Sequence, residues 1–379
     1  MKITTSRNTL AFAIQTANRA ISPRLPLPIL SGLLFEATGN HLTVTATDMD
    51  LTIQCRVEVS VEEEGAVVLP SRYIADLVRH LPDLPIEIQT PPGSHSAAIR
   101  YGTSQLNIHG FNPEQYPRPS SPAEGFSLPM NRNQLREMIR QVSFAVSSDE
   151  TRPIFTGILM QLKDGFFRLV ATDTHRLAVR QANIKTAGKP INIVVPGKTL
   201  NELARLITGE DRQVEIIAGE NHVFFQMEDI FLSSRIIAGQ FPPYEQAIPR
   251  ETSTSVRVET RSLLEATERA ALLVSNNTPV VHFSLGQNTC VVSVHTEAGW
   301  IREVIDVSVD GQPLDICFNA RYLIEILRAI PEEEALLEFT GPLSATIIRP
   351  VQNMDYLVLL LPARPFKSDG GTDEAMTDY

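Results

Sequence analysis

The sequence predicts an α+β fold built from three similar domains in tandem. Two kinds of amphipathic segment and one strand signature each recur along the 379 residues at intervals near 125 residues. Between the amphipathic segments, short stretches alternate apolar and polar residues, as half-buried antiparallel strands do. The interval is much longer than the roughly 20–50 residues of a solenoid repeat, so each unit is expected to own a hydrophobic core.

The clearest repeat is an apolar pair, a break, a basic residue and then a helical apolar period. It occurs as VVLPSRYIADLVRHL (67–81), IVVPGKTLNELARLI (193–207) and ICFNARYLIEILRAI (316–330). Aligning Pro70, Pro196 and Asn319, which are 126 and 123 residues apart, superposes the basic residues two positions on. Each of these segments is therefore predicted to hold one helix.

A second helical segment and a strand signature recur in the same order. The helical segments are RNTLAFAIQTANRAI (7–21), RNQLREMIRQVSFAV (132–146) and TRSLLEATERAALLV (260–274). In the first, apolar residues at helical spacing include Leu10, Ala13, Ile14 and Ala17. The strand signature is clear in residues 28–51 and 153–177 and decays in 279–300.

Each unit is thus predicted to contain, in order, a strand, a helix, several strands, a second helix and more strands. The stretches LTVTATD, FRLVATD and SVRVET alternate apolar and polar residues. Pro/Ser-rich stretches, PRPSSPAEG and PRETSTS, are typical of exposed linkers between units. The predicted domains are residues 1–122, 123–250 and 251–366, followed by a flexible acidic tail, 367–379.

Composition excludes several classes of protein. No apolar run approaches the roughly 20 residues of a membrane span, and the N-terminal segment lacks the apolar core of a secretion signal. The three cysteines, Cys55, Cys290 and Cys317, are far apart and form no metal-binding or disulfide pattern. These features favour a cytoplasmic protein without metal or cofactor.

Charge is distributed unevenly. The formal net charge of the whole chain is −11, yet the six predicted helical segments together carry +6. If all six helices line one surface, that surface is basic while the rest of the molecule is acidic. Basic side chains on such a surface would contact phosphates without reading bases.

No catalytic motif is complete. Gly197-Lys198-Thr199 resembles the end of a phosphate-binding loop, but Asn192 stands where that motif needs glycine. Asp173 and His175 are close enough in sequence for acid–base chemistry, although the first repeat has Asp48-Met49-Asp50 at the matching positions and no histidine. A structural or binding role therefore fits this segment better than catalysis.

The order of the segments ATDTHRL (171–177), VVPGKTLNEL (194–203) and FPPYEQAIP (241–249) resembles the bacterial DNA sliding clamps, the beta subunit of DNA polymerase III. The resemblance runs from Met1 to about Phe366. It implies a non-catalytic processivity factor: two chains form a head-to-tail ring around duplex DNA and tether replicative and repair polymerases and the clamp loader through short peptide motifs. Three domains cannot close a symmetric ring of six, but a homodimer can.

The resemblance also implies site residues. The dimer interface would pair the strand holding Leu106 and Ile108 with Leu272 and Leu273 of the other chain. The partner-peptide pocket would comprise Arg152, Phe155, Thr172, Thr174, His175, Arg176, Leu177, Pro242, Ala247, Ser344, Leu359 and Leu361. The DNA-facing residues would be Arg24, Arg72, Arg79, Arg136, Arg140, Lys198, Arg205, Arg321 and Arg328.

The first and third repeats are expected to lack the peptide pocket, because Met49-Asp50 and Glu297-Ala298 replace the Thr-His pair. Asp149 places an acid near the supposed DNA path, for which the sequence offers no account. Two alternatives stay open. One is a hydrolase or transferase that uses Asp173 and His175, and the other is a clamp paralogue that serves drug tolerance or a specialised polymerase.

Overall fold

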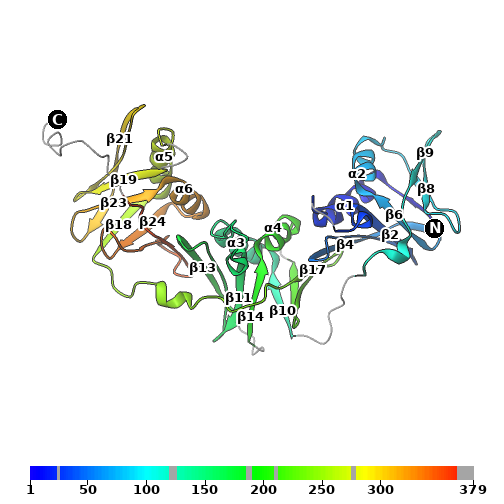
Figure 1. The fold of residues 1–379 in the computed structure, drawn as a ribbon, viewed down its shortest axis with the longest axis horizontal. Coiled ribbons are helices and arrows are strands. Elements are labelled where there is room, and N and C mark those ends of the chain that lie inside the picture. The colour runs from blue at the N-terminus through cyan, green and yellow to red at the C-terminus, as the bar shows by residue number, and fades with distance from the viewer. Residues whose placement is uncertain (24–25, 119–125, 185–189, 209–211, 275–278, 365–379) are drawn as a thin grey trace. The chain divides into compact units, whose positions relative to one another are not determined.

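The structure is a computed structural model that describes residues 1–23, 26–118, 126–184, 190–208, 212–274 and 279–364 (Figure 1). Each repeat has the predicted order of strand, helix, strands, helix and strands. The long helices within the described ranges are α1 (Arg7–Ala17), α2 (Ser71–His80), α3 (Arg132–Ser143), α4 (Gly197–Leu206), α5 (Thr260–Ala271) and α6 (Ala320–Ala329).

The helices form where the apolar periodicity places them. In α2 the buried residues include Ile74, Ala75 and Val78, which lie on one face at helical spacing. Side-chain caps fix where two of the helices begin. Ser6 accepts a hydrogen bond from the backbone N–H of Thr9 before α1, and Asn319 caps α6 in the same way.

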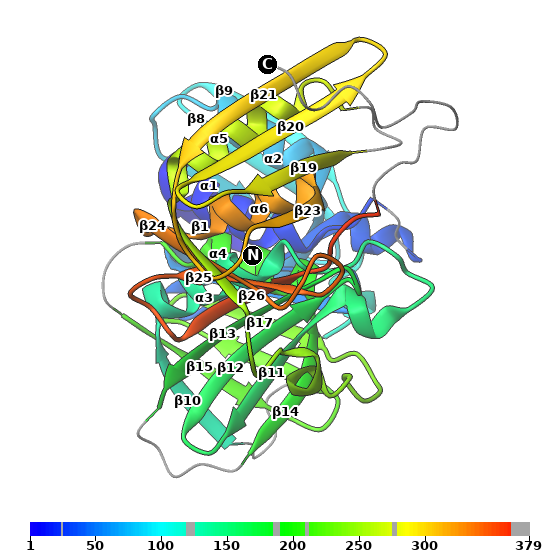
Figure 2. The ribbon, with the colours of Figure 1, turned by 90° about the vertical axis from the view of Figure 1, so that its left-hand side faces the viewer.

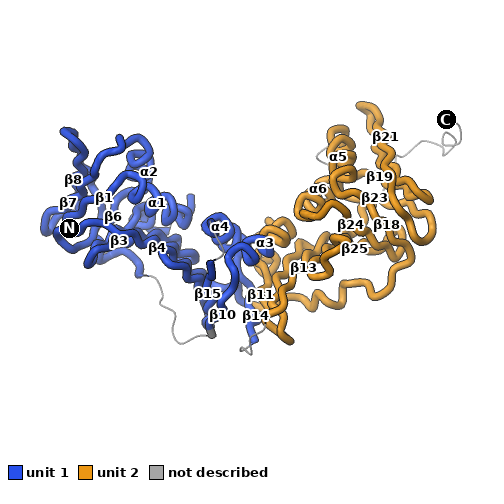
Figure 3. The backbone as a smooth tube through the Cα atoms, turned by 180° about the vertical axis from the view of Figure 1, so that it is seen from behind, with its two compact units in different colours: residues 1–139, 186–238 blue, residues 140–185, 239–379 orange. Residues whose placement is uncertain are grey.

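The chain divides into two compact units, residues 1–139 with 186–238 and residues 140–185 with 239–379 (Figure 3). Strand pairing between neighbouring repeats accounts for this division. In the first unit, β17 of the second repeat pairs with β4 of the first, and in the second unit, β13 of the second repeat pairs with β26 of the third. Half of the middle repeat therefore belongs to each unit.

The first unit contains two antiparallel sheets. The smaller has the order β5 (Ser60–Glu63), β1 (Lys2–Thr5), β7 (Ile86–Gln89), β8 (Ser96–Tyr101) and β9 (Ser104–His109). The larger has the order β10 (Phe126–Asn131), β15 (Gln213–Ala218), β16 (His222–Gln226), β17 (Ile230–Arg235), β4 (Leu51–Glu58), β3 (His41–Thr47), β2 (Gly32–Thr38) and β6 (Gly65–Pro70). This unit also holds β14 (Ile191–Pro196), η1 (Asn18–Ala20), η2 (Pro28–Ser31) and η3 (Pro113–Gln115).

The second unit repeats this plan. Its larger sheet runs through β11 (Gly157–Lys163), β12 (Phe166–Thr172), β13 (Arg176–Asn183), β26 (Tyr356–Leu360), β25 (Thr346–Pro350), β24 (Glu334–Phe339), β18 (Thr254–Glu259) and β22 (Ser308–Asp310). Its smaller sheet, whose strands Figure 2 labels, has the order β21 (Gly299–Asp306), β20 (Thr289–Thr296), β19 (Val280–Leu285) and β23 (Leu314–Asn319). Two short 3₁₀ helices, η4 (Pro153–Thr156) and η5 (Tyr244–Ala247), complete it.

The core lies between the helices and the sheets of each unit. Buried and half-buried residues alternate in the first four residues of β3 and of β12, as the period-two pattern of LTVTATD and FRLVATD predicts. The prediction is wrong further along, because residues 44–47 and 169–171 are buried one after another, Thr45 and Thr47 included. The largest fully buried side chains include Phe35 and Phe225 in the first unit and Phe167, Phe339 and Tyr356 in the second. The α+β prediction, with antiparallel sheets and two helices in each repeat, is confirmed.

Candidate functional site

The candidate site in the second unit starts from a tight turn between β12 and β13. The carboxylate of Asp173 accepts hydrogen bonds from the backbone N–H groups of His175 (2.9 Å) and Arg176 (3.0 Å). The Thr172 hydroxyl accepts from the N–H of Thr174 (3.1 Å) and donates to the carbonyl of Arg176 (2.7 Å). Thr174 adopts a φ of 78°, a left-handed conformation that these hydrogen bonds hold.

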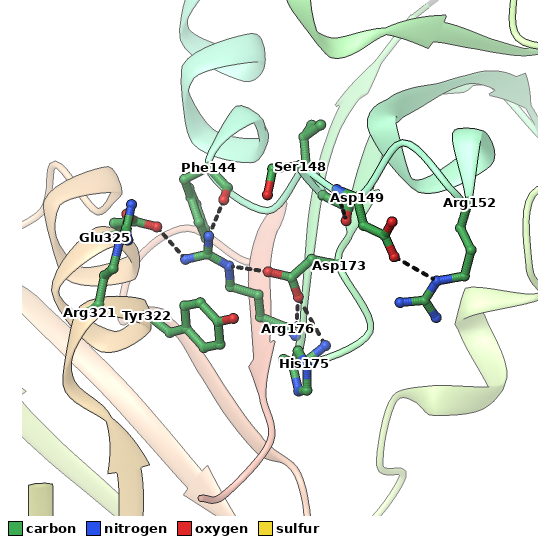
Figure 4. A pocket seen from close by; sticks show the side chains of 12 residues that line it. Phe144, Ser148, Asp149, Arg152, Asp173, His175, Arg176, Arg321, Tyr322 and Glu325 are labelled. Atoms are coloured by element: carbon green, nitrogen blue, oxygen red, sulfur yellow. Dashed lines mark hydrogen bonds and ion pairs between the residues drawn. The ribbon is translucent and has the colours of Figure 1, made fainter. Parts of the chain in front are cut away.

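The guanidinium of Arg176 lies among Phe144, Asp173, Tyr322 and Glu325 (Figure 4). Its side chain is only 6% exposed, and its guanidinium pairs with Asp173 (Nε to Oδ2, 3.0 Å) and with Glu325 of α6 (2.6 Å). The guanidinium also donates to the backbone carbonyl of Phe144. The rings of Phe144 and Tyr322 lie 5.1 and 4.4 Å from its central carbon, within cation–π range. Arg176 therefore joins the end of α3, the start of β13 and helix α6.

A cavity of about 650 Å³ opens beside this cluster. It is lined by residues of the loop after α3, of the turn before β13 and of α6, and Figure 4 shows Arg152, His175 and Arg321 around it. His175 stacks on Tyr322, with ring centroids 6.0 Å apart. The predicted residues Arg152, His175 and Arg176 are therefore brought together.

The apolar part of the predicted site follows the β13–β26 strand pair. Leu177 and Leu359 are directly opposite each other in the register of the two strands, and both are buried. The N–H of Leu361 donates to the carbonyl of His175 (2.9 Å), while its side chain is 45% exposed. Phe155 is half-buried, and the Arg152 guanidinium lies 5.4 Å from its ring centroid.

The remaining predicted peptide residues lie on other segments of the same unit. Pro242 is half-buried just before η5, and Ala247 is exposed at the end of η5. A second cavity, of about 270 Å³, is lined by Tyr244 and Ile248 together with Val179 and Leu357, so η5 lies against the β13–β26 pair. Ser344 is exposed in the turn between β24 and β25.

The geometry explains Asp149. Its carboxylate accepts hydrogen bonds from the backbone N–H (3.0 Å) and the hydroxyl (2.6 Å) of Thr151, and it pairs with Arg152 (3.4 Å). These contacts, led by the Thr151 hydroxyl, lower the pKa of Asp149 below its ordinary value. Asp149 thus caps a turn and orients Arg152 toward Phe155.

The same contacts argue against acid–base chemistry at Asp173 and His175. Both oxygens of the Asp173 carboxylate are engaged, one by two backbone N–H groups and the other by the Arg176 guanidinium. The imidazole of His175 instead stacks on Tyr322. A catalytic dyad would need the carboxylate to orient the imidazole.

Apart from Arg24, the predicted DNA-facing residues lie on the helices, and several are paired with acids. Lys198 contacts Asp48 (3.1 Å), Arg205 contacts Glu202 (2.6 Å), and Arg328 contacts Glu268 (2.7 Å). Similar pairs join Arg79 to Asp76 and Arg321 to Glu325, Arg136 donates to the carbonyl of Ile207, and Arg72 and Arg140 are exposed. Arg24 lies outside the described residues, as does the predicted tail.

The predicted interface residues lie at exposed edges. Leu106 and Ile108 belong to β9, which is the edge strand of the small sheet in the first unit. Leu272, at the end of α5, is 82% exposed, and Leu273 is half-buried. Sequence reasoning missed β21, the edge strand of the small sheet in the second unit, where Trp300 and Val304 are exposed.

Sequence reasoning also missed Phe144, Tyr322 and Glu325. Tyr322 and Glu325 are three residues apart and so share a face of α6, which is a signal present in the sequence. The tyrosine also recurs at the matching position of the first repeat, Tyr73. Nothing local in the sequence, however, shows that Phe144 would meet them.

Comparison with known protein families shows to which family this chain belongs. Models of the N-terminal, central and C-terminal domains of the DNA polymerase III beta subunit match residues 1–120, 129–243 and 245–364 in that order. The chain belongs to the DNA polymerase III beta subunit family, the sliding clamps. The predictions of this family and of three tandem clamp domains are confirmed.

Individual sliding clamps are similar to this chain in sequence and structure along almost its whole length. The beta sliding clamp of Halalkalibacterium halodurans is 32% identical over 93% of this chain and 97% of its own length. The crystal structure of the Bacillus subtilis sliding clamp has a TM-score of 0.93 at 30% identity and covers 97% of this chain and 100% of that one. A Pseudomonas aeruginosa sliding clamp bound to griselimycin has a TM-score of 0.92 at 26% identity, over 96% and 100%.

Family membership settles the class of function. Sliding clamps are non-catalytic processivity factors of DNA replication, so the hydrolase or transferase alternative is set aside. Among the described residues, no helix is long and apolar enough to span a membrane.

Proposed function

We propose that two copies of this chain close head-to-tail into a ring around duplex DNA and hold polymerases and other partners through the site around Leu177. The observation that carries the ring is the pair of sheet edges, β9 in the first unit and β21 in the second. Edge strands present unpaired N–H and C=O groups that can pair with another chain. We also propose a cytoplasmic location for the protein. The proposed domain boundaries are those predicted from the sequence: 1–122, 123–250 and 251–366, with a tail at 367–379.

The β9 and β21 edges suit an interface between copies. Along β21, side chains alternate between exposed and half-buried, and the exposed set includes Trp300, Arg302 and Val304. On β9, Ile108 is buried, Leu106 is half-buried, and their neighbours are polar. Apolar residues at the centre with polar residues around them are the usual anatomy of a stable interface.

The proposed peptide site lies along the β13–β26 pair, next to the cavity lined by Arg152 and His175. Leu361 and the ring of Phe155 offer apolar surface, while Arg152 and His175 supply polar groups at its rim. An extended peptide with leucine or phenylalanine anchors would bury those anchors on the apolar surface and be oriented by the polar rim. The clamp loader and the polymerases are the proposed sources of such peptides.

Replacing Leu361 by glutamate is expected to weaken a Leu/Phe-anchored peptide by about tenfold or more, because the substitution puts a charge on the surface that the anchor covers. Fluorescence anisotropy of a labelled peptide on the full chain measures this loss. Leu84→Glu is a matched control, since Leu84 is 43% exposed and Leu361 is 45% exposed. Equal affinities of the two variants would contradict the assignment of the pocket.

The proposed DNA contacts are weak individually. Five of the predicted basic residues are already paired with acidic side chains of their own unit. Because such exposed pairs must be given up or shared before a phosphate is bound, the net gain per contact is small. Weak, sequence-independent contacts allow a ring to slide while topology keeps it on the DNA.

Arg72→Ala is expected to reduce the slope of log affinity for duplex DNA against log salt concentration by about 1, the effect of losing one phosphate contact. Arg72 is exposed on α2. Arg212→Ala is the control, because Arg212 is 57% exposed but lies outside the helices. An unchanged slope in Arg72→Ala would remove this residue from the DNA path.

A further inference from the structure

The first repeat contains a cavity where the sequence predicted no peptide pocket. The cavity has a volume of about 190 Å³ and lies entirely within the first unit, beside the turn between β3 and β4 and the end of β17. Adding 125 to the lining residues Thr47, Thr52 and Pro117 gives Thr172, Leu177 and Pro242 of the proposed peptide site. The cavity therefore occupies the equivalent place in the first repeat.

The strand register confirms this equivalence. Thr52 of β4 is opposite Ser233 of β17, just as Leu177 of β13 is opposite Leu359 of β26. Two residues further along, Arg235 stands where the other site has Leu361. The two sites thus share one backbone frame.

The turns at the mouths of the two sites are also alike. Met49 has a φ of 82°, close to the 78° of Thr174. Its N–H donates to the Thr47 hydroxyl (3.1 Å), and the Asp48 carboxylate accepts from the N–H groups of Asp50 (3.2 Å) and Leu51 (2.8 Å). This is the hydrogen-bond pattern of residues 172–176, so both sites are preformed by the same local structure.

The chemistry of the lining is different. Hydroxyl groups of Thr52 and Ser233 replace the two leucines, and both residues are less than 9% exposed. Two arginines stand at the rim: Arg235, 63% exposed, replaces Leu361, and Arg118, 60% exposed, replaces Pro243. An apolar anchor that suits the second-repeat site would meet polar groups here.

We propose that this cavity is a second binding site, which takes a carboxylate side chain of an acidic peptide segment. The guanidinium groups of Arg235 and Arg118 are the donors for this carboxylate, because the Thr52 hydroxyl already donates to the Thr47 hydroxyl (2.8 Å). The inference rests on the proposed peptide-binding function of the equivalent site in the second repeat. A volume below the roughly 300–1,000 Å³ of ordinary ligand pockets leaves room for one or two side chains rather than a folded partner.

Neighbouring charges set the strength of the site. Asp50 lies 3.7 Å from Arg235, and Glu36 pairs with Arg118, so both guanidiniums are held near the cavity by acids of the same unit. His222 lines the cavity as well and stacks on Phe224. A bound carboxylate shares these arginines with Asp50 and Glu36, and the affinity is therefore modest and sensitive to salt.

The test uses the full chain and two labelled peptides, one with three consecutive glutamates and one with glutamines in their place. By fluorescence anisotropy at low salt, the glutamate peptide is expected to bind about tenfold more tightly, and Arg235→Leu is expected to remove about that advantage. Arg212→Leu is the matched control, because Arg212 is a similarly exposed arginine of the same unit that does not line the cavity.

Equal binding of the two peptides would overturn the proposal. It would also fall if Arg212→Leu weakened binding as much as Arg235→Leu, because the attraction would then be a general effect of charge. Displacement of the peptide by an equimolar amount of acetate would show a site for a bare anion and overturn the peptide assignment. The Leu361→Glu variant separates the two sites: it should impair the Leu/Phe-anchored peptide and leave the acidic peptide bound. If the unmodified chain bound the acidic peptide but not the Leu/Phe-anchored peptide, the result would count against the proposed function and not against the role of Arg235.

Discussion

Replacing Arg176 by alanine is expected to lower the free energy of unfolding by about 3–5 kcal/mol, the range for breaking a buried ion pair from one side. The Arg176 side chain is 6% exposed and the Asp173 side chain is 11% exposed. Removal of the guanidinium leaves the Asp173 carboxylate without its charged partner and leaves a void between the rings of Phe144 and Tyr322. Urea denaturation followed by circular dichroism measures the loss.

Arg321→Ala is the matched control for this effect. Arg321 pairs with the same Glu325, but its side chain is 80% exposed, so the expected cost is about 0–1 kcal/mol. Arg176→Lys keeps the charge but loses the planar group that lies against both rings, and an intermediate stability is expected. If Arg176→Ala were as stable as Arg321→Ala, Arg176 would be a surface peptide contact and not the link between α3, β13 and α6.

The Leu272→Ala, Leu273→Ala double variant is expected to be monomeric. Leu272 is an 82% exposed leucine at the end of α5, where an apolar side chain gains stability only by meeting another chain. Two leucines at the centre of an interface contribute roughly 2 kcal/mol each, so the dissociation constant should rise about 1,000-fold. Light scattering or sedimentation at micromolar concentration measures the molecular mass of the variant in solution directly.

Leu343→Ala provides the comparison, because Leu343 is 79% exposed in the same unit but lies in the turn before β25. It should leave the dimer intact. The monomeric double variant should still bind the Leu/Phe-anchored peptide, because the proposed pocket residues belong to the second unit of a single chain. If the double variant kept the mass of a dimer, the assignment of the interface to the end of α5 would be wrong.

The repeats made the fold predictable from the sequence. Segments such as 67–81, 193–207 and 316–330 carry a helical period three times, and the helices α2, α4 and α6 lie within them. Local patterns of this kind reflect which face of an element is buried, and that face depends on few distant residues. The strand pairing across repeats, β17 with β4 and β13 with β26, leaves no such local pattern.

The candidate site was predictable only in part, for the same reason. The turn around Thr172, Asp173 and Thr174 follows from residues adjacent in sequence, and its counterpart in the first repeat could be aligned by inspection. The enclosure of Arg176 depends on Phe144 and Glu325, which are 32 and 149 residues away. A sequence shows the charge of an arginine but not whether distant residues bury it.

Retention on circular against linearised DNA tests the central claim most directly. The chain would be loaded onto both by a compatible clamp loader at moderate salt, and the bound fraction would be followed after removal of the loader. A ring held by topology should stay on circles and leave linear DNA rapidly from the ends, because phosphate contacts are the same on both. Equal loss from circular and linear DNA would contradict encirclement by this chain.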